Sequence, residues 1–445
     1  MKNILVLGAG RSSFSLINYL LKNSTDFDWK VTVGDVSEES ALQKTKNHPN
    51  SRALKFDVND QSQREKEISS ADIVISLLPP SLHLIAALDC LKYSKSLITA
   101  SYVSAEIREL EKEAKNKGIL LLNEMGLDPG IDHMSAMHII ERLKASGADI
   151  VSFKSYCGGL VAPESNDNPW GYKFSWNPRN VIVAGQGTAK YLENGRIKYL
   201  PYNRLFKEIE TTEVHDLGYF DAYANRDSIS YKEPYGLNNT GNLLRGTLRM
   251  QGYCRAWNVF VQLGITDDTY HIFNSQGMSH ADFISSFLPV NQPGDNLRSK
   301  LASFVGEEED SETIRKITWT GILDNTPITL NNATPAQVLQ DLLEKKWILK
   351  HDDKDMIVMQ HEFEYNLNNQ RRHLTSSMVV KGIDEVNTAM AQTVGLPVAI
   401  AAKLILTGKI NLTGVHIPTV KEIYDPVLKE LENYNVHFKE KETIV

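Results

Sequence analysis

Residues 4–13 read ILVLGAGRSS, an apolar run that passes directly into two glycines one residue apart. Residues 4–7 have the length and composition of a buried parallel strand. Gly8 suits the tight turn after such a strand, and Gly10 lets the backbone approach a pyrophosphate. A helix that opens at Arg11, Ser12 and Ser13 would offer its N–H groups to the phosphates. The motif is GxGxxS, because Ser13 stands where a third glycine or alanine is typical.

Short apolar runs alternate with amphipathic stretches up to about residue 125. We expect strands at 4–7, 31–33, 53–58, 73–75, 96–100 and 119–122. Between them the spacing of apolar residues predicts helices, for example over 14–21 and 104–117. This alternation predicts an α/β fold with an N-terminal doubly wound parallel sheet, a Rossmann dinucleotide-binding domain.

Asp35 ends the second expected strand, about 20 residues after the glycine turn, where an acid can bind the ribose hydroxyls of the cofactor. The same carboxylate would face the 2′-phosphate of NADP. Two unit charges about 5 Å apart cost about 3 kcal/mol at an effective dielectric of 20. Asp35 therefore predicts NAD as the cofactor and NADP as the second choice, unless a neighbouring Lys or Arg offsets the charge.

The fourth and fifth strands end in residues that would lie at the same edge of the sheet as the glycine turn. Leu78 and Pro79 follow the fourth strand, with His83 shortly after, and Ala100 ends the fifth. We predict cofactor contacts there, with local packing at a helix start as the alternative for His83. Ser101 and Tyr102 would face the nicotinamide and substrate, or else belong to a hydrogen-bonded loop.

Composition narrows the class of protein. The 445 residues predict two or three domains, with 42% hydrophobic residues and a net charge of −7. With 48 basic against 55 acidic residues, we expect no nucleic-acid partner. Mean hydropathy is −0.30, and no apolar run reaches the roughly 20 residues of a membrane span. Three scattered cysteines and an N-terminus without a secretory pattern predict a cytoplasmic protein with no metal centre.

Beyond residue 125 the strand–helix alternation stops, and three zones of different composition follow. We predict the Rossmann domain over 1–128 plus about 393–445. A mixed α+β substrate-binding and dimerisation domain is expected over 129–290 plus about 351–392, and a small helical domain over 291–350. Within the last zone Thr334, Pro335 and Gln337 are typical of a helix start.

Short motifs run through nearly the whole chain in a fixed order. They are LGAG at 7–10, LLPP at 77–80, ASY at 100–102, NEMGLDPGIDH at 123–133, YCGGL at 156–160, KFSWNPR at 173–179, NRDS at 225–228 and LRGTLR at 244–249. In these motifs the chain resembles the L-glutamate-forming saccharopine dehydrogenases, also called saccharopine reductases. One departure stands out: fungal relatives that use NADP tend to place an Arg just after the second strand, where this chain has Gly34-Asp35-Val36-Ser37.

The resemblance implies a homodimeric enzyme that converts saccharopine, water and an oxidised nicotinamide cofactor into L-glutamate and 2-aminoadipate 6-semialdehyde. It implies that Asp128, Cys157 and Tyr102 lie near the reacting nitrogen. Saccharopine carries three carboxylates and two amines, so cationic partners are required. The implied substrate-binding residues are Ser101, Gly158, Arg226, Arg245 and Thr247, and Arg249 is a further carboxylate candidate.

Two other functions remain compatible with the sequence. A carboxynorspermidine or carboxyspermidine synthase carries out a similar reductive condensation, but the arginines would repel its polyamine substrate. A catalytically silent NAD(H)-binding protein would need only the glycine turn. The presence of Asp128 and Cys157 favours an enzyme over this second alternative.

Overall fold

The computed structural model describes residues 1–290 and 296–445. The chain divides into two compact units. The first comprises Met1–Ile150, Tyr365–Arg372 and Met378–Val445, and the second comprises Val151–Glu364 and His373–Ser377. The predicted start of the helical domain, residue 291, lies outside the described residues.

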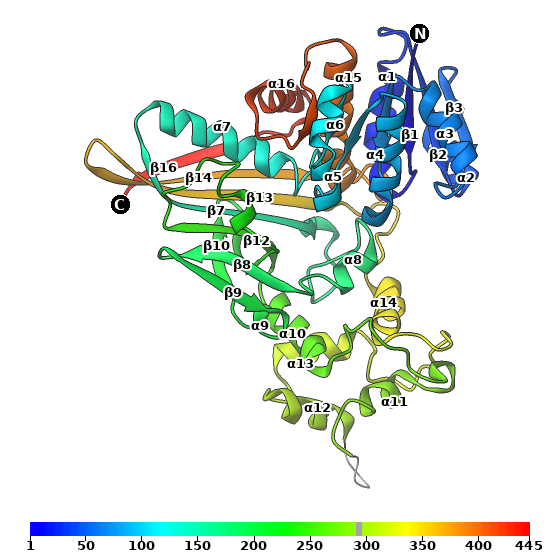
Figure 1. The fold of residues 1–445 in the computed structure, drawn as a ribbon. Helices are drawn as coiled ribbons and strands as arrows, with labels where there is room; N and C mark the ends of the chain where they lie inside the picture. Colours follow the sequence, from blue (N-terminus) through cyan, green and yellow to red (C-terminus); the bar gives the residue numbers. More distant parts are fainter. Residues whose placement is uncertain (291–295) are drawn as a thin grey trace. The chain divides into compact units, whose positions relative to one another are not determined.

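The first unit is built on a seven-stranded parallel sheet, drawn mostly in blue and cyan in Figure 1. Its strand order is β15-β6-β5-β4-β1-β2-β3. The strands are β1 (Lys2–Leu7), β2 (Trp29–Asp35), β3 (Ser51–Lys55), β4 (Ile73–Ser76), β5 (Ser96–Thr99), β6 (Leu120–Leu122) and β15 (Gly414–His416). The order reverses between β1 and β4, which is the point where doubly wound sheets bind nucleotides.

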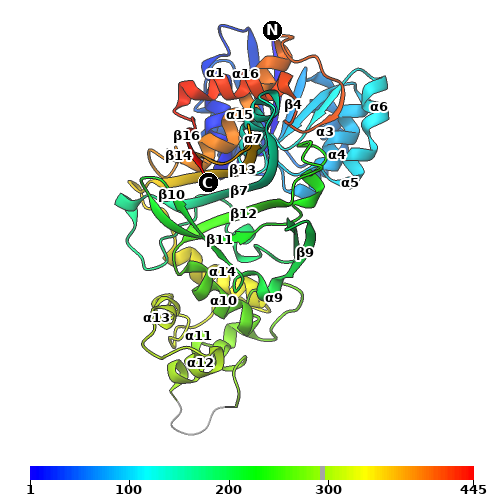
Figure 2. The ribbon, with the colours of Figure 1, turned by 90° about the vertical axis from the view of Figure 1, so that its left-hand side faces the viewer.

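Helices cover both faces of this sheet, as Figure 2 shows for α1 and α15 on one side and α3 and α4 on the other. The helices of the first unit are α1 (Phe14–Lys22), α2 (Glu38–Thr45), α3 (Gln61–Ser70), α4 (His83–Lys92), α5 (Ala105–Glu109), α6 (Glu111–Asn116), α7 (Ile131–Ala145), α15 (Ala389–Leu406) and α16 (Lys421–Leu431). Alternate strand residues such as Leu5, Val74 and Leu97 pack against α3 to α6. Because both faces are buried, the strands are apolar throughout.

The predicted Rossmann fold is confirmed. The predicted helix over 104–117 is wrong in one respect, since Leu110 separates α5 from α6. By length and composition, α15 is the one helix among the described residues that could cross a membrane. It is 72% buried within the protein, as expected for a core helix.

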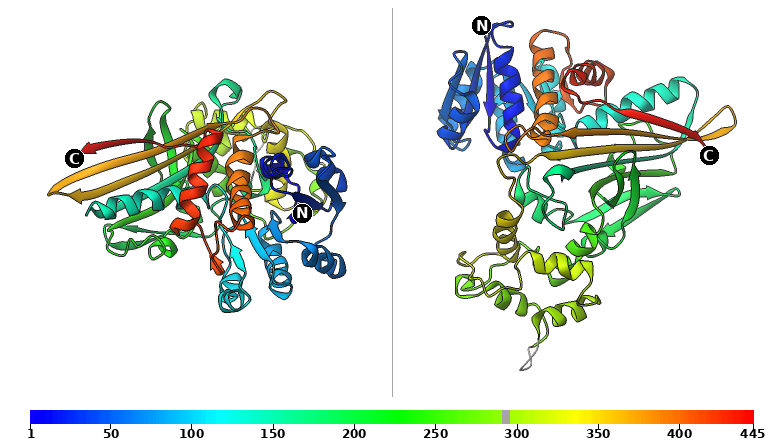
Figure 3. Two further views of the ribbon diagram at one scale, coloured as in Figure 1. Left: turned by 90° about the horizontal axis from the view of Figure 1, so that it is seen from above. Right: turned by 180° about the vertical axis from the view of Figure 1, so that it is seen from behind.

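The second sheet has the order β10-β11-β12-β7-β13-β14-β16, with β8 and β9 attached to β12. Its strands are β7 (Asp149–Val161), β8 (Thr188–Glu193), β9 (Arg196–Pro201), β10 (Glu210–Val214), β11 (Gly218–Ala224), β12 (Asn242–Met250), β13 (Asp355–Leu367), β14 (Gln370–Lys381) and β16 (Lys439–Ile444). Strands β13 and β14 form the long hairpin that is gold in Figure 3. In this sheet β7 and β12 run parallel, and β11 and β12 antiparallel.

Seven helices accompany the second sheet in the part of the chain that the structure describes. They are α8 (Pro178–Ile182), α9 (Tyr202–Leu205), α10 (Tyr253–Leu263), α11 (His280–Ser285), α12 (Leu297–Val305), α13 (Glu312–Trp319) and α14 (Pro335–Lys346). The predicted start of α14 is confirmed, with Thr334 and Gln337 forming a capping box around Pro335. Aromatic side chains dominate the core of this unit: Trp170, Tyr172, Tyr253, Trp257 and Trp347 are almost completely buried.

Gly395 of α15 lies against the backbone of α1. A Cβ atom there would lie 2.9 Å from the backbone nitrogen of Leu16. We expect Gly395→Ala to lower the free energy of unfolding by about 1–2 kcal/mol, because overpacking outweighs the gain in helix propensity. Urea denaturation measures this change. Gly241→Ala is the control, since its nearest contact would be 3.7 Å away, and equal midpoints for the two variants would contradict the prediction.

Candidate active site

The glycine turn joins β1 to the first helix at the carboxyl edge of the parallel sheet. Gly8 has a φ of 103°, and a Cβ there would lie 2.9 Å from the carbonyl oxygen of Leu77. A Cβ on Gly10 would meet nothing within 4 Å. Arg11 and Gly10 are exposed, whereas Ser13 is buried and donates its hydroxyl to the Gly10 carbonyl. The turn therefore has the tight first glycine and the open second glycine that a pyrophosphate requires.

Both carboxylate oxygens of Asp35 are bonded to the backbone around this turn. Oδ2 accepts the N–H of Ala9 at 2.7 Å, and Oδ1 accepts the N–H of Ser37 at 2.9 Å. These bonds hold the negative charge at the end of β2, beside the glycine turn. The predicted cofactor residues Leu78 and Ala100 are half-buried, and Pro79 is exposed, just beyond the ends of β4 and β5.

His83 lies at the same edge, at the first residue of α4, and is 2% exposed. Its Nδ1 is 2.8 Å from the hydroxyl of Ser76, and its Nε2 is 2.7 Å from the hydroxyl of Ser101. Burial lowers the pKa of the imidazole from 6.5 to about 4. His83 is therefore a neutral ring near pH 7, hydrogen-bonded through both nitrogens. From the sequence, His83 was predicted to contact the cofactor, and its hydrogen bonds to Ser76 and Ser101 were not predicted.

Tyr102 and Asp128 are brought together by the structure, as the resemblance implies. The phenol of Tyr102 donates to Oδ1 of Asp128 at 3.1 Å. Tyr102 follows β5, and Asp128 lies in the turn between β6 and α7. Both side chains are half-buried, so they remain partly accessible.

A buried group of acidic and imidazole side chains supports this pair. Oε1 of Glu124 accepts the N–H of Val103, the residue after Tyr102, at 3.1 Å. Oε2 of Glu124 lies 2.9 Å from Nε2 of His133, and Nδ1 of His133 lies 3.6 Å from Asp132. Neither Glu124 nor His133 was predicted as a site residue from the sequence. Their positions near the two ends of the 123–133 motif were the sequence signal that could have identified them.

The turn that carries Asp128 is closed by its own backbone. The N–H of Gly126 donates to the Pro129 carbonyl at 2.9 Å, and Asp132 accepts the N–H of Gly130 at 2.6 Å. Gly130 has a φ of 149°, and a Cβ there would lie 2.0 Å from the Gly126 carbonyl oxygen. Only glycine fits this position. The peptide bond between Asp128 and Pro129 is cis.

In the second unit, Cys157 and Thr247 occupy one row of the sheet. Thr247 on β12 is opposite Cys157 on β7 and opposite Tyr223 on β11. Cys157 is 7% exposed, and Thr247 is half-buried. A Cβ on Gly158 would lie 2.7 Å from the Leu248 carbonyl oxygen, so the glycine allows β7 and β12 to pack closely.

Arg226 and Arg245 lie on adjoining backbone segments. The N–H of Asn225 donates to the carbonyl of Arg245 at 2.8 Å. Arg226 is exposed and has a φ of 50°. Arg245 is 2% exposed, and its guanidinium lies 4.5 Å above the ring of Tyr231. The structure therefore gives the two predicted carboxylate ligands quite different surroundings.

Arg249, two residues beyond Thr247 on β12, is enclosed by aromatic rings. It is 5% exposed, and its guanidinium lies 5.3 Å from the ring centre of Tyr172, 5.4 Å from Tyr253 and 5.8 Å from Tyr223. Its Nη1 donates to the Leu248 carbonyl. Within residues 1–290 and 296–445 no carboxylate forms an ion pair with it, and its Nε has no acceptor.

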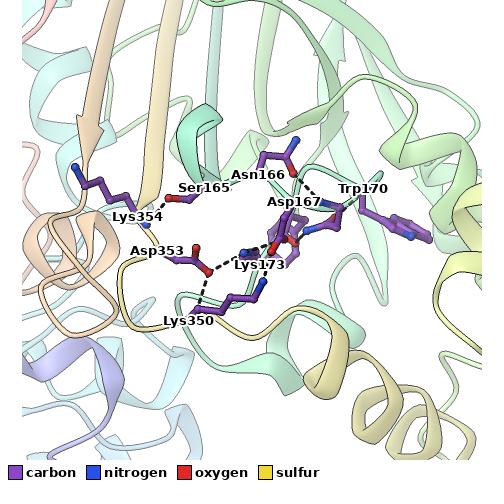
Figure 4. A network of polar contacts seen from close by, with 10 residues as sticks. Ser165, Asn166, Asp167, Trp170, Lys173, Lys350, Asp353 and Lys354 are labelled. Atoms are coloured by element: carbon purple, nitrogen blue, oxygen red, sulfur yellow. Dashed lines mark hydrogen bonds and ion pairs between the residues drawn. The ribbon is translucent and has the colours of Figure 1, made fainter.

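A second buried cation of this unit is fully compensated, and the sequence analysis did not identify it. Figure 4 shows Lys173, 1% exposed, whose Nζ lies 2.9 Å from Asp167 and 2.6 Å from Asp353. Lys350 shares Asp167 and lowers the pKa of that carboxyl to about 2 together with Lys173. This network joins the segment after β7 to the segment before β13.

The low pKa of His83 makes stability depend on pH. Because the unfolded chain binds a proton below about pH 6.5 and the folded chain only below about pH 4, stability is complete above 6.5 and falls as the pH is lowered. We expect the wild type to lose about 2 kcal/mol relative to His83→Gln between pH 7 and pH 5. Urea denaturation at both pH values measures the difference. Parallel pH profiles for the two proteins would contradict the prediction.

Comparison with known proteins finds similarity to saccharopine dehydrogenases along nearly the whole chain. The saccharopine dehydrogenase NADP binding domain matches residues 4–122, and the saccharopine dehydrogenase C-terminal domain matches residues 126–436. The chain is 35% identical to the saccharopine dehydrogenase (NADP(+), L-glutamate-forming) of Pyricularia oryzae, covering 99% of both chains. It is also 35% identical to the mitochondrial alpha-aminoadipic semialdehyde synthase of Mus musculus, covering 100% of this chain and 48% of that protein.

Solved structures give the same result. Apo saccharopine dehydrogenase (L-Glu forming) from Saccharomyces cerevisiae superposes with a TM-score of 0.88 at 33% identity, covering all of both chains. The homospermidine synthase of Legionella pneumophila shares the fold, with a TM-score of 0.58 at 10% identity, and covers 99% of this chain and 91% of its own. The chain belongs to the saccharopine dehydrogenase family.

Proposed function

We propose that this chain oxidises saccharopine with NAD and water to L-glutamate, 2-aminoadipate 6-semialdehyde, NADH and a proton. The carbon bonded to the secondary amine on the lysine-derived side gives up a hydride, and water then cleaves the resulting imine, so that this carbon becomes the aldehyde and the nitrogen leaves with glutamate. The observation that carries the proposal is Arg249, a buried guanidinium that has no carboxylate partner among the described residues.

An unpaired buried cation is costly, because the folded protein removes its water without supplying an opposite charge. Asp221, opposite Arg249 on β11, forms no ion pair with it in the described part of the chain, and its Oδ2 accepts the N–H of Cys254 at 3.1 Å. The surrounding rings give cation–π attraction, which is worth about 2 kcal/mol when desolvated. This is less than a paired carboxylate supplies. A substrate carboxylate is the group that fits Arg249.

Arg226 and Arg245 supply further positive charge on the same unit. With Arg249 they form a set of cations that matches the three carboxylates of saccharopine and would repel a polyamine. Arg245 and Arg249 both belong to β12, with Thr247 between them, so their side chains leave the strand on the same face. One face of β12 therefore carries the side chains that we expect to bind the acidic substrate.

Asp128 and Tyr102 are suited to the amine of the substrate. Their hydrogen bond holds a carboxylate and a phenol side by side. The carboxylate of Asp128 can accept a hydrogen bond from the amine and hold its proton. The substrate's own secondary amine can carry a proton through the reaction. These residues therefore bind and orient the nitrogen more than they drive a separate acid–base step.

The glycine turn fits a nicotinamide dinucleotide, which would supply the hydride acceptor for the reaction. Gly8 and Gly10 would lie under its pyrophosphate, and Asp35 beside its adenosine ribose. The curated fungal relatives are named for NADP(+). We nevertheless propose NAD for this chain, because the backbone bonds of Asp35 leave its charge no freedom to move away from a 2′-phosphate.

Replacing Arg249 separates its contribution to binding from its contribution to folding. We expect Arg249→Met to raise the KM for saccharopine about 10- to 100-fold, as loss of a charged hydrogen bond does. The thermal unfolding midpoint should stay equal or rise, because a buried unpaired charge is removed. Arg255→Met is the control, since Arg255 is an exposed partner of Glu307. A lower midpoint with an unchanged KM would show that Arg249 is structural.

Absorbance at 340 nm with saccharopine tests the reaction and the cofactor together. We expect the kcat/KM with NAD to exceed that with NADP by about 100-fold, the equivalent of about 3 kcal/mol. Asp35→Asn keeps the oxygen that accepts the Ala9 N–H and removes the charge, so it should reduce this ratio at least about tenfold. A wild type that prefers NADP would refute the cofactor proposal. Absence of turnover with both cofactors would refute the reaction.

A further inference from the structure

We infer that His83 is a positioning residue that fixes the direction of the Ser101 hydroxyl at the substrate site, an inference that rests on the proposed function. His83 itself is 2% exposed and is enclosed between β4, β5 and the start of α4. Ser101, in contrast, is half-buried and directly precedes Tyr102. The histidine therefore acts on the substrate through the serine and not by contact.

The geometry is a chain of three side chains, from the end of β4, the start of α4 and the loop after β5. Ser76, the last residue of β4, is 2.8 Å from Nδ1, and Ser101 is 2.7 Å from Nε2. Thr99 lies 3.4 Å from Nε2 and accepts the N–H of Ser101 at 3.2 Å. Both ring nitrogens are thus engaged by hydroxyl groups, and the backbone of Ser101 is held by the same small cluster.

A neutral imidazole has one N–H donor and one acceptor nitrogen. In either arrangement of that proton, the hydroxyl of Ser76 and the hydroxyl of Ser101 have complementary roles. The hydroxyl of Ser101 therefore has one role towards a ligand for each tautomer: it donates to an unprotonated Nε2 and leaves its oxygen as an acceptor, or it accepts from a protonated Nε2 and leaves its hydrogen as a donor. Since the ring is buried and its pKa is lowered to about 4, it keeps this neutral form at physiological pH.

The consequence lies in the binding of the substrate. A hydroxyl that is already oriented loses no rotational freedom when it bonds to a ligand, which strengthens the bond. Ser101 and Tyr102 are consecutive, and Tyr102 bonds to Asp128. The His83 network therefore controls a hydroxyl next to the residues that we assign to the substrate's amine.

Two amide substitutions of His83 test the roles of Nδ1 and Nε2 separately. The amide of His83→Gln reaches the position of Nε2 and can still bond to Ser101. The shorter amide of His83→Asn reaches the position of Nδ1 and can bond only to Ser76. We expect His83→Gln to keep the KM for saccharopine within about threefold of wild type. We expect both His83→Asn and Ser101→Ala to raise this KM about tenfold.

The double variant His83→Asn with Ser101→Ala tests the coupling. If His83 acts only through Ser101, the double variant has the KM of Ser101→Ala alone. Calorimetric titration with saccharopine gives a second readout that is independent of turnover, and the affinities should follow the same order. Thermal unfolding of each variant shows whether it is folded.

The outcomes separate the possible failures. Equal KM values for His83→Gln and His83→Asn, or losses that multiply in the double variant, overturn the positioning role even if both proteins are less stable. A wild type that shows no turnover of saccharopine refutes the proposed function and this inference with it. An active wild type whose variants behave alike overturns this inference only.

Discussion

Both oxygens of the Glu124 carboxylate are engaged inside the first unit, one by the N–H of Val103 and one by His133. The bonds tie the loop after β5 to the first turn of α7. Tyr102 lies on one side of this tie and Asp128 on the other, so their hydrogen bond depends on it. Removing one partner of a buried polar contact costs about 1–3 kcal/mol, because the other is left unsatisfied. The alignment of the candidate catalytic pair is therefore part of the fold and not a property of two mobile loops.

The parallel sheet could be predicted because its residues carry strong local signals. Buried strands such as β1 and β4 are continuous apolar runs, and the glycine turn has a fixed spacing after β1. The capping pattern of Thr334, Pro335 and Gln337 predicted the start of α14. The resemblance implied that Tyr102 and Asp128 both lie near the reacting nitrogen, but their hydrogen bond, between residues 26 positions apart, is visible only in the structure.

Other features could not be predicted because they depend on contacts distant in sequence. Strand β15 is only three residues long, and it is a strand because β6 pairs with it. The strands of the second sheet alternate buried and exposed residues irregularly, and Lys173 meets Asp353, which is 180 residues away. Burial also changes the meaning of a residue. His83 reads as an ordinary polar side chain in the sequence, and only its two hydroxyl neighbours show how it is held.

Lys173 and Arg249 show how the second unit treats buried charge. Both are at least 95% buried, yet Lys173 lies between two carboxylates and Arg249 lies among tyrosine rings. The buried charge of Lys173 is explained by folding alone. Asp167 and Asp353 compensate the charge of Lys173, and the network links two segments of the chain. Folding does not account for the buried charge of Arg249, since an apolar side chain in the same ring of aromatics would avoid the cost of desolvation. The cation is explained when an anionic substrate completes its environment, and the carboxylates of saccharopine have the charge that this position lacks.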